Sequence, residues 1–473
     1  MKRFLLFLFV IAGIIIQTAC KKEAEKDPYI PAEETPDTPL YQSHTEWSYN
    51  LGIYEVNVRQ YTAQGTFRAF ESHLPRLKEM DAGILWLMPI HPIGEVNRIG
   101  SMGSYYSVKD YLDVNPEFGT MTDFLHLVDA IHEQGMFVII DWVANHTSWD
   151  NPLTINNPGY YSKDEYGNFI PPPGTNWSDV IDLDYSNSSL RSYMMNQMKY
   201  WITETGIDGF RCDAVDYVPM DFWSSTTEFL REVNPGIFML AEGDKAAYHT
   251  AGFDMTYAWA LHGFNSGILR AIYEGTKTAN DLATYLQNDF ISYPATAYRM
   301  YFTSNHDENS WNGTVFEQFG ESAEAFAVLT HTLHGMPMIY SGQEAGLNKR
   351  LAFFERDPIV WNEHPFNDLY TTLLHLKKEN KALWNGDAGG RAQRIATGIS
   401  EAIYAFMREK EGDKLMAVFN LTGDEQAFSL NGNSYAGSYT NVFTAADVSL
   451  NADHELTLGA WEYVLLETRA EEN

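Results

Sequence analysis

Gly209-Phe-Arg-Cys-Asp-Ala-Val-Asp216 is a short apolar run that ends in one arginine and two acids. Side chains two residues apart on a strand point to the same side, so Arg211 and Asp213 would lie together. The arginine would keep the aspartate ionised. A parallel barrel presents reactive side chains in this way, at solvent-reachable strand ends. A purely structural ion pair is the alternative interpretation of this stretch alone.

Seven further apolar runs alternate with amphipathic helical patterns on both sides of this stretch. The apolar runs predict strands over 53–58, 84–88, 137–141, 237–242, 253–257, 298–304 and 337–340. The amphipathic patterns predict helices over 67–80, 124–133, 190–203, 222–233 and 366–378. Continuous apolar strands that alternate with helices indicate a parallel sheet covered on both faces. Eight such units predict an α/β fold built on a closed (β/α)₈ TIM barrel.

Two long segments do not follow this alternation. Residues 147–188 are rich in Asn, Pro, Gly and Tyr, and they follow the third predicted strand. They predict a loop domain over the mouth of the barrel, where such loops gather. Short β-patterns with Gly, Asn and Asp turns predict a C-terminal antiparallel β-sandwich over 384–473. The barrel would then comprise 46–146 and 189–383.

The first residues carry a targeting pattern. A basic start and an apolar run precede Gln17-Thr-Ala-Cys20. This arrangement resembles a bacterial lipoprotein signal peptide over 1–19, with lipid attached to Cys20, and ordinary secretion is the alternative. Residues 20–45 are charged and proline-rich, which predicts a flexible tether. We therefore expect a lipid-anchored protein of the bacterial cell envelope, on the periplasmic or surface face of the outer membrane.

The charge balance limits the classes of partner. The formal net charge is −31, which argues against nucleic acids and anionic membrane surfaces because both require basic patches. The lipid anchor would be the sole membrane contact. A neutral polysaccharide is compatible with this charge, and 14% aromatic residues supply flat faces for sugar rings, although most aromatics pack cores. The two cysteines, Cys20 and Cys212, cannot form a disulfide framework.

Four predicted strand ends carry polar residues together. They read Asp141-Trp-Val-Ala-Asn145-His146, Arg211-Cys-Asp213, Glu242-Gly-Asp244 and Asn305-His306-Asp307-Glu308-Asn309. All strands of a barrel end at the same rim, so these residues would converge there. Unpaired buried acids are costly. Four acid-bearing strand ends therefore favour a catalytic site over a structural explanation.

These four stretches resemble the conserved blocks of the α-amylase family, glycoside hydrolase family 13. The resemblance implies that Asp213 is the nucleophile, that Glu242 is the general acid and base, and that Asp307 stabilises the transition state. Glu242 must begin the reaction protonated, so its surroundings should raise its pKa. The resemblance further implies sugar-binding or supporting roles for four residues: Tyr106, His146, Arg211 and His306.

The same resemblance suggests a metal and further sugar contacts. Asn145 and Asp182 match two calcium-ligand positions of the family, so they are candidate ligands of a structural calcium. Several tryptophans near the predicted rim loops are candidates for stacking on further glucose units, although half or more could only pack the loops. They are Trp142, Trp149, Trp177, Trp259 and Trp311.

The resemblance implies a retaining hydrolase that cleaves α-1,4-glucosidic bonds of starch, glycogen or maltooligosaccharides. Within the family, a maltogenic or cyclodextrin-opening hydrolase, an α-glucosidase and a transglycosylase remain open. A glucan-binding lipoprotein without catalysis is the alternative from another class. The presence of Asp213, Glu242 and Asp307 together argues against it. The α-glucan is the expected partner, together with other glucan-uptake proteins of the envelope.

Overall fold

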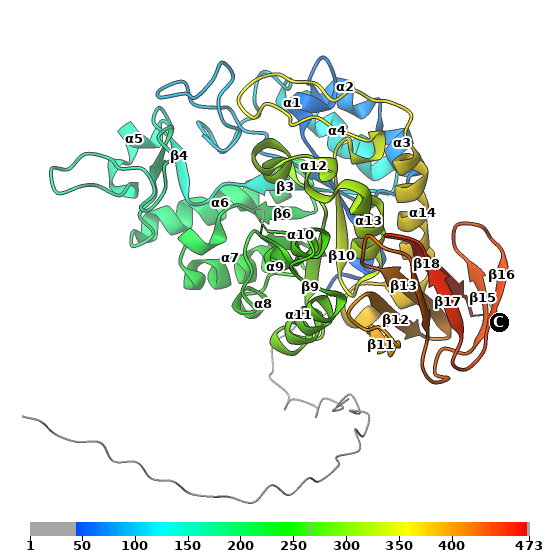
Figure 1. Ribbon diagram of the computed structural model, residues 1–473. Helices are drawn as coiled ribbons and strands as arrows, with labels where there is room; N and C mark the ends of the chain where they lie inside the picture. The colour runs from blue at the N-terminus through cyan, green and yellow to red at the C-terminus, as the bar shows by residue number, and fades with distance from the viewer. Residues whose placement is uncertain (1–43, 264–265, 471–473) are drawn as a thin grey trace, which may run out of the picture. The chain divides into compact units, whose positions relative to one another are not determined.

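The computed structural model describes residues 44–263 and 266–470. In this part of the chain, eight parallel strands close into a barrel in the order β1-β10-β9-β8-β7-β6-β3-β2 (Figure 1). They are β1 (Ile53–Val56), β2 (Ile84–Leu87), β3 (Phe137–Trp142), β6 (Gly209–Cys212), β7 (Phe238–Ala241), β8 (Met255–Tyr257), β9 (Tyr298–Tyr301) and β10 (Met336–Tyr340). Every predicted strand is present, and the predicted (β/α)₈ fold is confirmed.

Helices of the described residues lie outside the barrel strands, and one of them, α5, belongs to the segment inserted after β3. They are α1 (Val58–Tyr61), α2 (Phe67–Glu71), α3 (Leu74–Glu79), α4 (Met121–Glu133), α5 (Leu153–Asn156), α6 (Ser188–Thr205), α7 (Met220–Val233), α8 (Ala247–Thr250), α9 (Trp259–His262), α10 (Ile268–Tyr273), α11 (Ala279–Ser292), α12 (Val315–Phe319), α13 (Ala323–Thr332) and α14 (Pro365–Glu379). One prediction was wrong, because the helix expected over 67–80 is two helices. Pro75 lacks the amide hydrogen needed inside a continuous helix, but it is tolerated in the first turn of α3.

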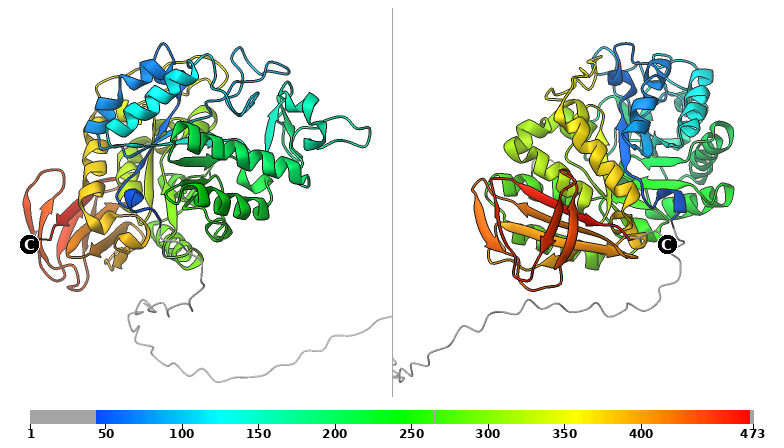
Figure 2. Two further views of the ribbon diagram at one scale, coloured as in Figure 1. Left: turned by 180° about the vertical axis from the view of Figure 1, so that it is seen from behind. Right: turned by 90° about the vertical axis from the view of Figure 1, so that its right-hand side faces the viewer.

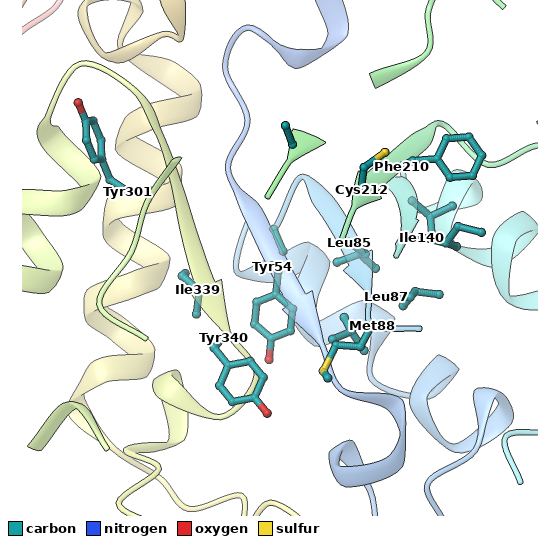
Figure 3. Packing of buried hydrophobic residues seen from close by; sticks show 14 of the residues in the cluster. Tyr54, Leu85, Leu87, Met88, Ile140, Phe210, Cys212, Tyr301, Ile339 and Tyr340 are labelled. Atoms are coloured by element: carbon teal, nitrogen blue, oxygen red, sulfur yellow. The ribbon is translucent and has the colours of Figure 1, made fainter. Parts of the chain in front are cut away.

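Alternate side chains of the barrel strands belong to two separate cores. Ile53, Ile84 and Ile139 point into the barrel, where they pack with inward side chains of the other strands. Their neighbours, such as Leu85 and Ile140, face outward into the layer between strands and helices (Figure 3). This period-two alternation determines which polar residues at the strand ends can reach the mouth of the barrel.

Gly209 shows why the stretch that opens β6 begins with glycine. A Cβ atom at this position would lie 2.1 Å from the carbonyl oxygen of Phe238 on β7. Neighbouring strands therefore approach too closely here for any larger residue. The close approach sets the start of the strand that carries Arg211.

The end of the barrel where the strands begin is covered by the first described residues. Trp47 stacks on Phe137 with ring centroids 4.0 Å apart, and His44 stacks on Tyr298, also at 4.0 Å. His44 is buried, and its Nδ1 lies 2.8 Å from a carboxylate oxygen of Asp254. The tether was predicted to extend to residue 45, but His44 belongs to the folded part. Its partner lies 210 residues away, where local composition gives no signal.

The segment after β3 forms a small structure of its own. β4 (His146–Ser148) and β5 (Val180–Asp182) pair in antiparallel fashion, with α5 between them. Figures 1 and 2 show this part of the chain, in cyan-green, projecting from the barrel. It begins at the carboxyl end of β3, which is the rim that carries the predicted site.

The C-terminal region is antiparallel β-structure. Its strands are β11 (Gln393–Ile395), β12 (Ile403–Lys410), β13 (Asp413–Asn420), β14 (Gln426–Ser429), β15 (Gly437–Asn441), β16 (Asp447–Leu450), β17 (Glu455–Leu458) and β18 (Tyr463–Thr468). In the described residues, six of them form one sheet, and β14 pairs with β17. Both sheets contribute to one buried cluster. The sequence patterns did not reveal β15, β16 and β17, because each alternates polar residues with few apolar ones.

Candidate active site

Strand alternation brings the polar residues of the rim together. Asp141 of β3 pairs with Arg211 of β6 in the barrel register. Arg211 lies between the outward-facing Phe210 and Cys212, so its side chain points into the barrel. Asp213 follows two residues later and points the same way. The sequence therefore aims an arginine and its acids into the mouth of the barrel.

Arg211 is the centre of this site. Its Nη1 donates to Asp141 at 2.9 Å and to Asp213 at 2.8 Å, and its Nη2 lies 2.8 Å from Glu242. Arg211 and Asp141 are buried, whereas the side chains of Asp213 and Glu242 remain 11% and 15% exposed. The buried guanidinium thus lies beneath the more exposed carboxyl groups of Asp213 and Glu242 and holds both in place.

Glu242 occupies an environment that favours its protonated form. Burial raises its pKa, and the negative charges of Asp213 and Asp307 add to this effect, so that despite Arg211 the pKa reaches about 8. Its second oxygen accepts the backbone N–H of Ala214 at 2.7 Å. Ala214 has a φ of 45°, a left-handed conformation that alanine rarely adopts and that is typical of functional sites. Glu242 can therefore supply a proton at neutral pH.

His306 lies on the other side of the site. Burial lowers its pKa, but the charges of Asp307 and Glu55 outweigh burial and raise the pKa to about 9. The protonated ring donates to Glu55 at 2.5 Å and to the hydroxyl oxygen of Tyr106 at 2.7 Å. The Tyr106 hydroxyl in turn donates to Asp141 at 3.1 Å. A continuous hydrogen-bonded chain therefore runs from Glu55 to Arg211.

His146 contributes a neutral ring to the same mouth. Burial lowers its pKa, with Asp213 acting in the opposite direction. The side-chain amide of Asn145 lies 3.2 Å from its Nδ1, and the ring of Trp177 lies 5.3 Å from its ring. A neutral imidazole can donate one hydrogen bond to a sugar hydroxyl while its other nitrogen accepts from Asn145.

The two candidate calcium ligands, Asn145 and Asp182, lie close to each other. Asp182 pairs with His146 in the β4–β5 ladder, and the carbonyl of Asn145 accepts the N–H of Leu183 at 3.1 Å. One oxygen of Asp182 accepts a hydrogen bond from Ser162 at 2.5 Å. In the described residues, no three or more His, Cys, Asp or Glu side chains gather as metal ligands. Calcium takes six to eight oxygens, including amide and backbone carbonyls, so Asn145 and Asp182 would supply only part of its coordination.

The structure brings together the seven residues that the resemblance selected: Tyr106, His146, Arg211, Asp213, Glu242, His306 and Asp307. Sequence reasoning missed Glu55, Trp86 and Tyr257. The indole N–H of Trp86 donates to Asp141 at 3.2 Å, and Arg211 Nε donates to the Tyr257 hydroxyl at 3.3 Å. Glu55 could have been found, because an acid at an inward position of an apolar strand requires a partner.

The candidate tryptophans separate into different environments. Trp142 is fully buried and packs edge-on against Phe210, so it cannot contact a sugar. Trp259 packs on Tyr257 and Phe302 at the barrel interior. Trp311 is 51% exposed. Trp142 therefore only packs the structure, whereas stacking on glucose units stays a prediction for Trp149, Trp177, Trp259 and Trp311.

Comparisons with known proteins agree with this geometry. The family model described as "Alpha amylase, catalytic domain" matches residues 41–169 and 175–414, and "Maltogenic Amylase, C-terminal domain" matches residues 399–465. Alpha-amylase 3 of Dictyoglomus thermophilum is 26% identical over 464 residues, which cover 83% of this chain and 89% of the relative.

Two solved structures superpose closely. The α-amylase of Lactobacillus plantarum gives a TM-score of 0.79 at 31% identity, over 89% of this chain and all of that one. A noncanonic maltogenic α-amylase of Thermotoga neapolitana gives 0.80 at 29% identity, over 88% and 98% of the two chains. With its closed barrel and its rim of carboxyl groups around Arg211, the chain belongs to the α-amylase family of glycoside hydrolases.

Proposed function

We propose that the enzyme is a retaining hydrolase of α-1,4-glucosidic bonds in starch, glycogen or maltooligosaccharides. The observation that carries this proposal is the pair of carboxyl groups held by one guanidinium. Asp213 is ion-paired with Arg211 at 2.8 Å, while burial and neighbouring acids raise the pKa of Glu242 to about 8. One carboxylate and one carboxylic acid at a shared site are the two groups that glycoside hydrolysis with retention requires.

The two groups perform two successive displacements. In the first, Glu242 gives its proton to the glycosidic oxygen while Asp213 attacks C1, so the C1–O bond breaks and a β-glycosyl ester forms. In the second, the Glu242 carboxylate takes a proton from water, and the water oxygen attacks C1 and releases Asp213. The product keeps the α configuration, and both residues return to their starting protonation states.

The surrounding residues prepare this chemistry. Arg211 fixes the orientation of Asp213 and spreads its own charge over three carboxyl groups. The protonated His306 fixes Tyr106, whose ring can lie beneath the reacting sugar. Asp307, 25% exposed and 3.4 Å from His306, can accept hydrogen bonds from sugar hydroxyls and stabilise the positive charge that develops at C1.

Product analysis tests the proposal. The purified protein is incubated with soluble starch, pullulan and β-cyclodextrin beside its Asp213→Asn variant. We expect short maltooligosaccharides from starch with the native enzyme alone. Glucose as the sole product would indicate an α-glucosidase instead. No hydrolysis of any substrate by the folded protein would refute the proposal and favour a glucan-binding role.

A maltogenic or cyclodextrin-opening activity is the second candidate. It is favoured by the C-terminal match to a maltogenic amylase domain and by the likeness to the Thermotoga neapolitana enzyme. This activity would produce mainly maltose, and it would open β-cyclodextrin faster than it cleaves starch. The same product analysis distinguishes it from an endo-acting α-amylase.

The proposed cellular setting rests on the sequence alone. We propose that Cys20 carries lipid and anchors the enzyme in the bacterial envelope, where it would serve glucan uptake beside other envelope proteins. Cys20 and residues 1–19 lie outside the described residues, and within those residues no helix is long and apolar enough to cross a bilayer. Cys20→Ser should abolish incorporation of radiolabelled palmitate. Unchanged labelling of this variant would refute the anchor.

A further inference from the structure

Aromatic side chains continue from the active site beyond the residues that the mechanism uses. The ring of Phe353 lies nearly parallel to that of Tyr106, with 6.3 Å between centroids and 12° between planes. The ring centroid of Trp311 lies 5.2 Å from that of Phe353 and 5.8 Å from that of Phe354. Trp311 is 51% exposed, so a large apolar face stays in water at the mouth of the site. We call Trp311, Phe353 and Phe354 the outer aromatic platform.

The backbone beneath this platform is held by polar residues of another segment. Gln60 donates to the carbonyls of Ala352 and Glu355 at 2.9 and 2.7 Å, and the buried Arg59 donates to that of Phe353 at 3.3 Å. The N–H of Met102 donates to the carbonyl of Phe354 at 3.0 Å. These bonds hold the backbone of this loop in place. A rigid, pre-positioned aromatic face costs little entropy on binding.

The Trp311 side of the platform is fixed in a similar way. Trp311 belongs to the helical turn η4 (Glu308–Asn312), which directly follows Asp307. The Asn309 side chain on this turn donates to the carbonyl of Lys349 at 3.1 Å and accepts the N–H of Leu351 at 2.9 Å. The turn after β9 and the loop after β10 are thus joined, and together they present one surface.

The platform adjoins the residue on which the reacting sugar can lie. The ring of Phe353 is nearly parallel to that of Tyr106 and lies 6.4 Å from that of His306. Glu242, the proton donor to the leaving group, instead contacts Arg211 and the backbone N–H of Ala214. The platform thus continues from the position of the sugar that stays on the enzyme, and not from the residues next to the proton donor.

A second aromatic pair lies near the proton donor. The N–H of Ala214 binds Glu242, and the short turn η3 (Val215–Tyr217) follows directly. The ring of Tyr217, 50% exposed, lies 5.7 Å from that of Trp177. This pair is next to the proton donor, so it adjoins the leaving group.

We propose that the outer aromatic platform binds the glucose units on the non-reducing side of the cleaved bond and so determines where a glucan chain is cut. The flat apolar faces of pyranose rings stack on tryptophan and phenylalanine. The inference rests on the proposed function, because it takes the substrate to be an α-glucan and Glu242 to be the acid.

Maltoheptaose labelled with 2-aminopyridine at its reducing end tests the position of cleavage. With Trp311→Ala, fewer glucose units should bind on the non-reducing side, so the labelled fragments should become longer. Trp177→Ala should make them shorter. Each change should alter the ratio of adjacent cleavage products by about fivefold to tenfold. Trp311→Phe should restore most of the native pattern.

The matched control is Tyr166→Ala, which removes an aromatic side chain that is 82% exposed in the inserted segment after β3. This variant should give the native fragment pattern. An unchanged pattern with Trp311→Ala, or a shift toward shorter labelled fragments, would overturn the inference.

Binding without turnover separates this inference from the proposed function. Calorimetry measures the dissociation constant for maltoheptaose in the Asp213→Asn variant. Adding Trp311→Ala to this variant should raise that constant about fivefold to tenfold. Equal affinity with and without the Trp311 indole would overturn the platform even if the native enzyme hydrolyses starch. Weakened affinity would support the platform even if the native enzyme proved inactive.

Discussion

Arg211 and Arg408 are both fully buried, yet their surroundings differ completely. Arg211, at the mouth of the barrel, binds three carboxyl groups, and although burial opposes it, these neighbours raise its pKa well above the usual range. Arg408, where β12 meets the barrel, donates to the backbone carbonyls of Gly390, Thr332, Leu333 and Trp384. Burial lowers its pKa to about 9.

The difference shows how the same side chain serves structure in one place and chemistry in another. At the junction, Arg408 needs only neutral oxygens in the right positions to hold the C-terminal sheet against the barrel. At the mouth, more carboxyl groups gather than Arg211 can balance. Burial, opposed by Arg211 and reinforced by Asp213, raises the pKa of Asp141 to about 7, and Glu242 likewise retains a proton. Burial, together with the excess of acids, creates a proton donor.

Replacing Arg211 should have the largest effect on activity. Arg211→Met removes the group that orients Asp213 and Glu242, so kcat/KM should fall by about 10⁴-fold, comparable to the loss of a member of a catalytic triad. Starch hydrolysis by the folded variant, checked by circular dichroism, measures this. If Arg211→Met were as active as Arg408→Met, the contrast between the two sites would be wrong.

Replacing Arg408 should mainly affect stability. Arg408→Met leaves four buried carbonyls without a charged donor, so the free energy of unfolding should fall by about 3 kcal/mol. The kcat of the protein that remains folded should stay within about twofold of native, because the site lies elsewhere. Urea denaturation followed by fluorescence, together with activity per folded molecule, checks both parts. A large loss of kcat without loss of stability would contradict the assigned role.

The pH profile should reveal the retained proton on Glu242. This residue must be protonated for the first step, and its pKa is raised from 4.5 to about 8. Consequently kcat/KM should begin to fall tenfold per pH unit only above about pH 8. With the ordinary pKa of about 4.5, the fall would begin near pH 4.5. With α-maltosyl fluoride, whose leaving group needs no proton, the native enzyme should lose this alkaline decline. Persistence of the decline with the fluoride would assign it to another group.

Lys377 should show the smallest effect, with the opposite dependence on pH. It is buried at the same junction as Arg408, and burial, with the nearby Arg408, lowers its pKa well below 10.5. Its folded state therefore binds protons less readily than its unfolded state, so native stability rises with pH until the unfolded value is reached. Replacing Lys377 removes a costly buried charge, but it also removes hydrogen bonds to the carbonyls of Gly335 and Leu383 at 3.3 and 2.8 Å. The stability of Lys377→Met at pH 7 should therefore stay within about 1 kcal/mol of native.

Relative to the native protein, Lys377→Met should lose stability as the pH rises toward 10.5, and denaturation series at several pH values measure this. A stability gain that grew with pH would contradict the lowered pKa. For Glu242 the sign is reversed. Its folded state holds the proton more tightly, so its contribution to stability is full below about 4.5 and is lost as the pH rises through about 8.

Most of the barrel could be predicted because its strands are short apolar runs that alternate with helical patterns. The catalytic residues could be predicted from motifs at the ends of those strands. Contacts between parts of the chain that are distant in sequence could not be predicted. His306 binds Glu55 across 251 residues, and the burial of Trp142 depends on a neighbouring strand. The junction of Arg408 depends on carbonyl positions, which carry no sequence signal.

The central claim is that Asp213 forms a covalent bond with the sugar while Glu242 transfers the proton. The most direct test is to trap this intermediate with 5-fluoro-α-maltosyl fluoride and to locate it by peptide mass spectrometry. We expect one glycosyl adduct, on the peptide that contains Asp213, and α-configured products by NMR. An adduct on Glu242 or Asp307, or inverted products without any adduct, would contradict the account.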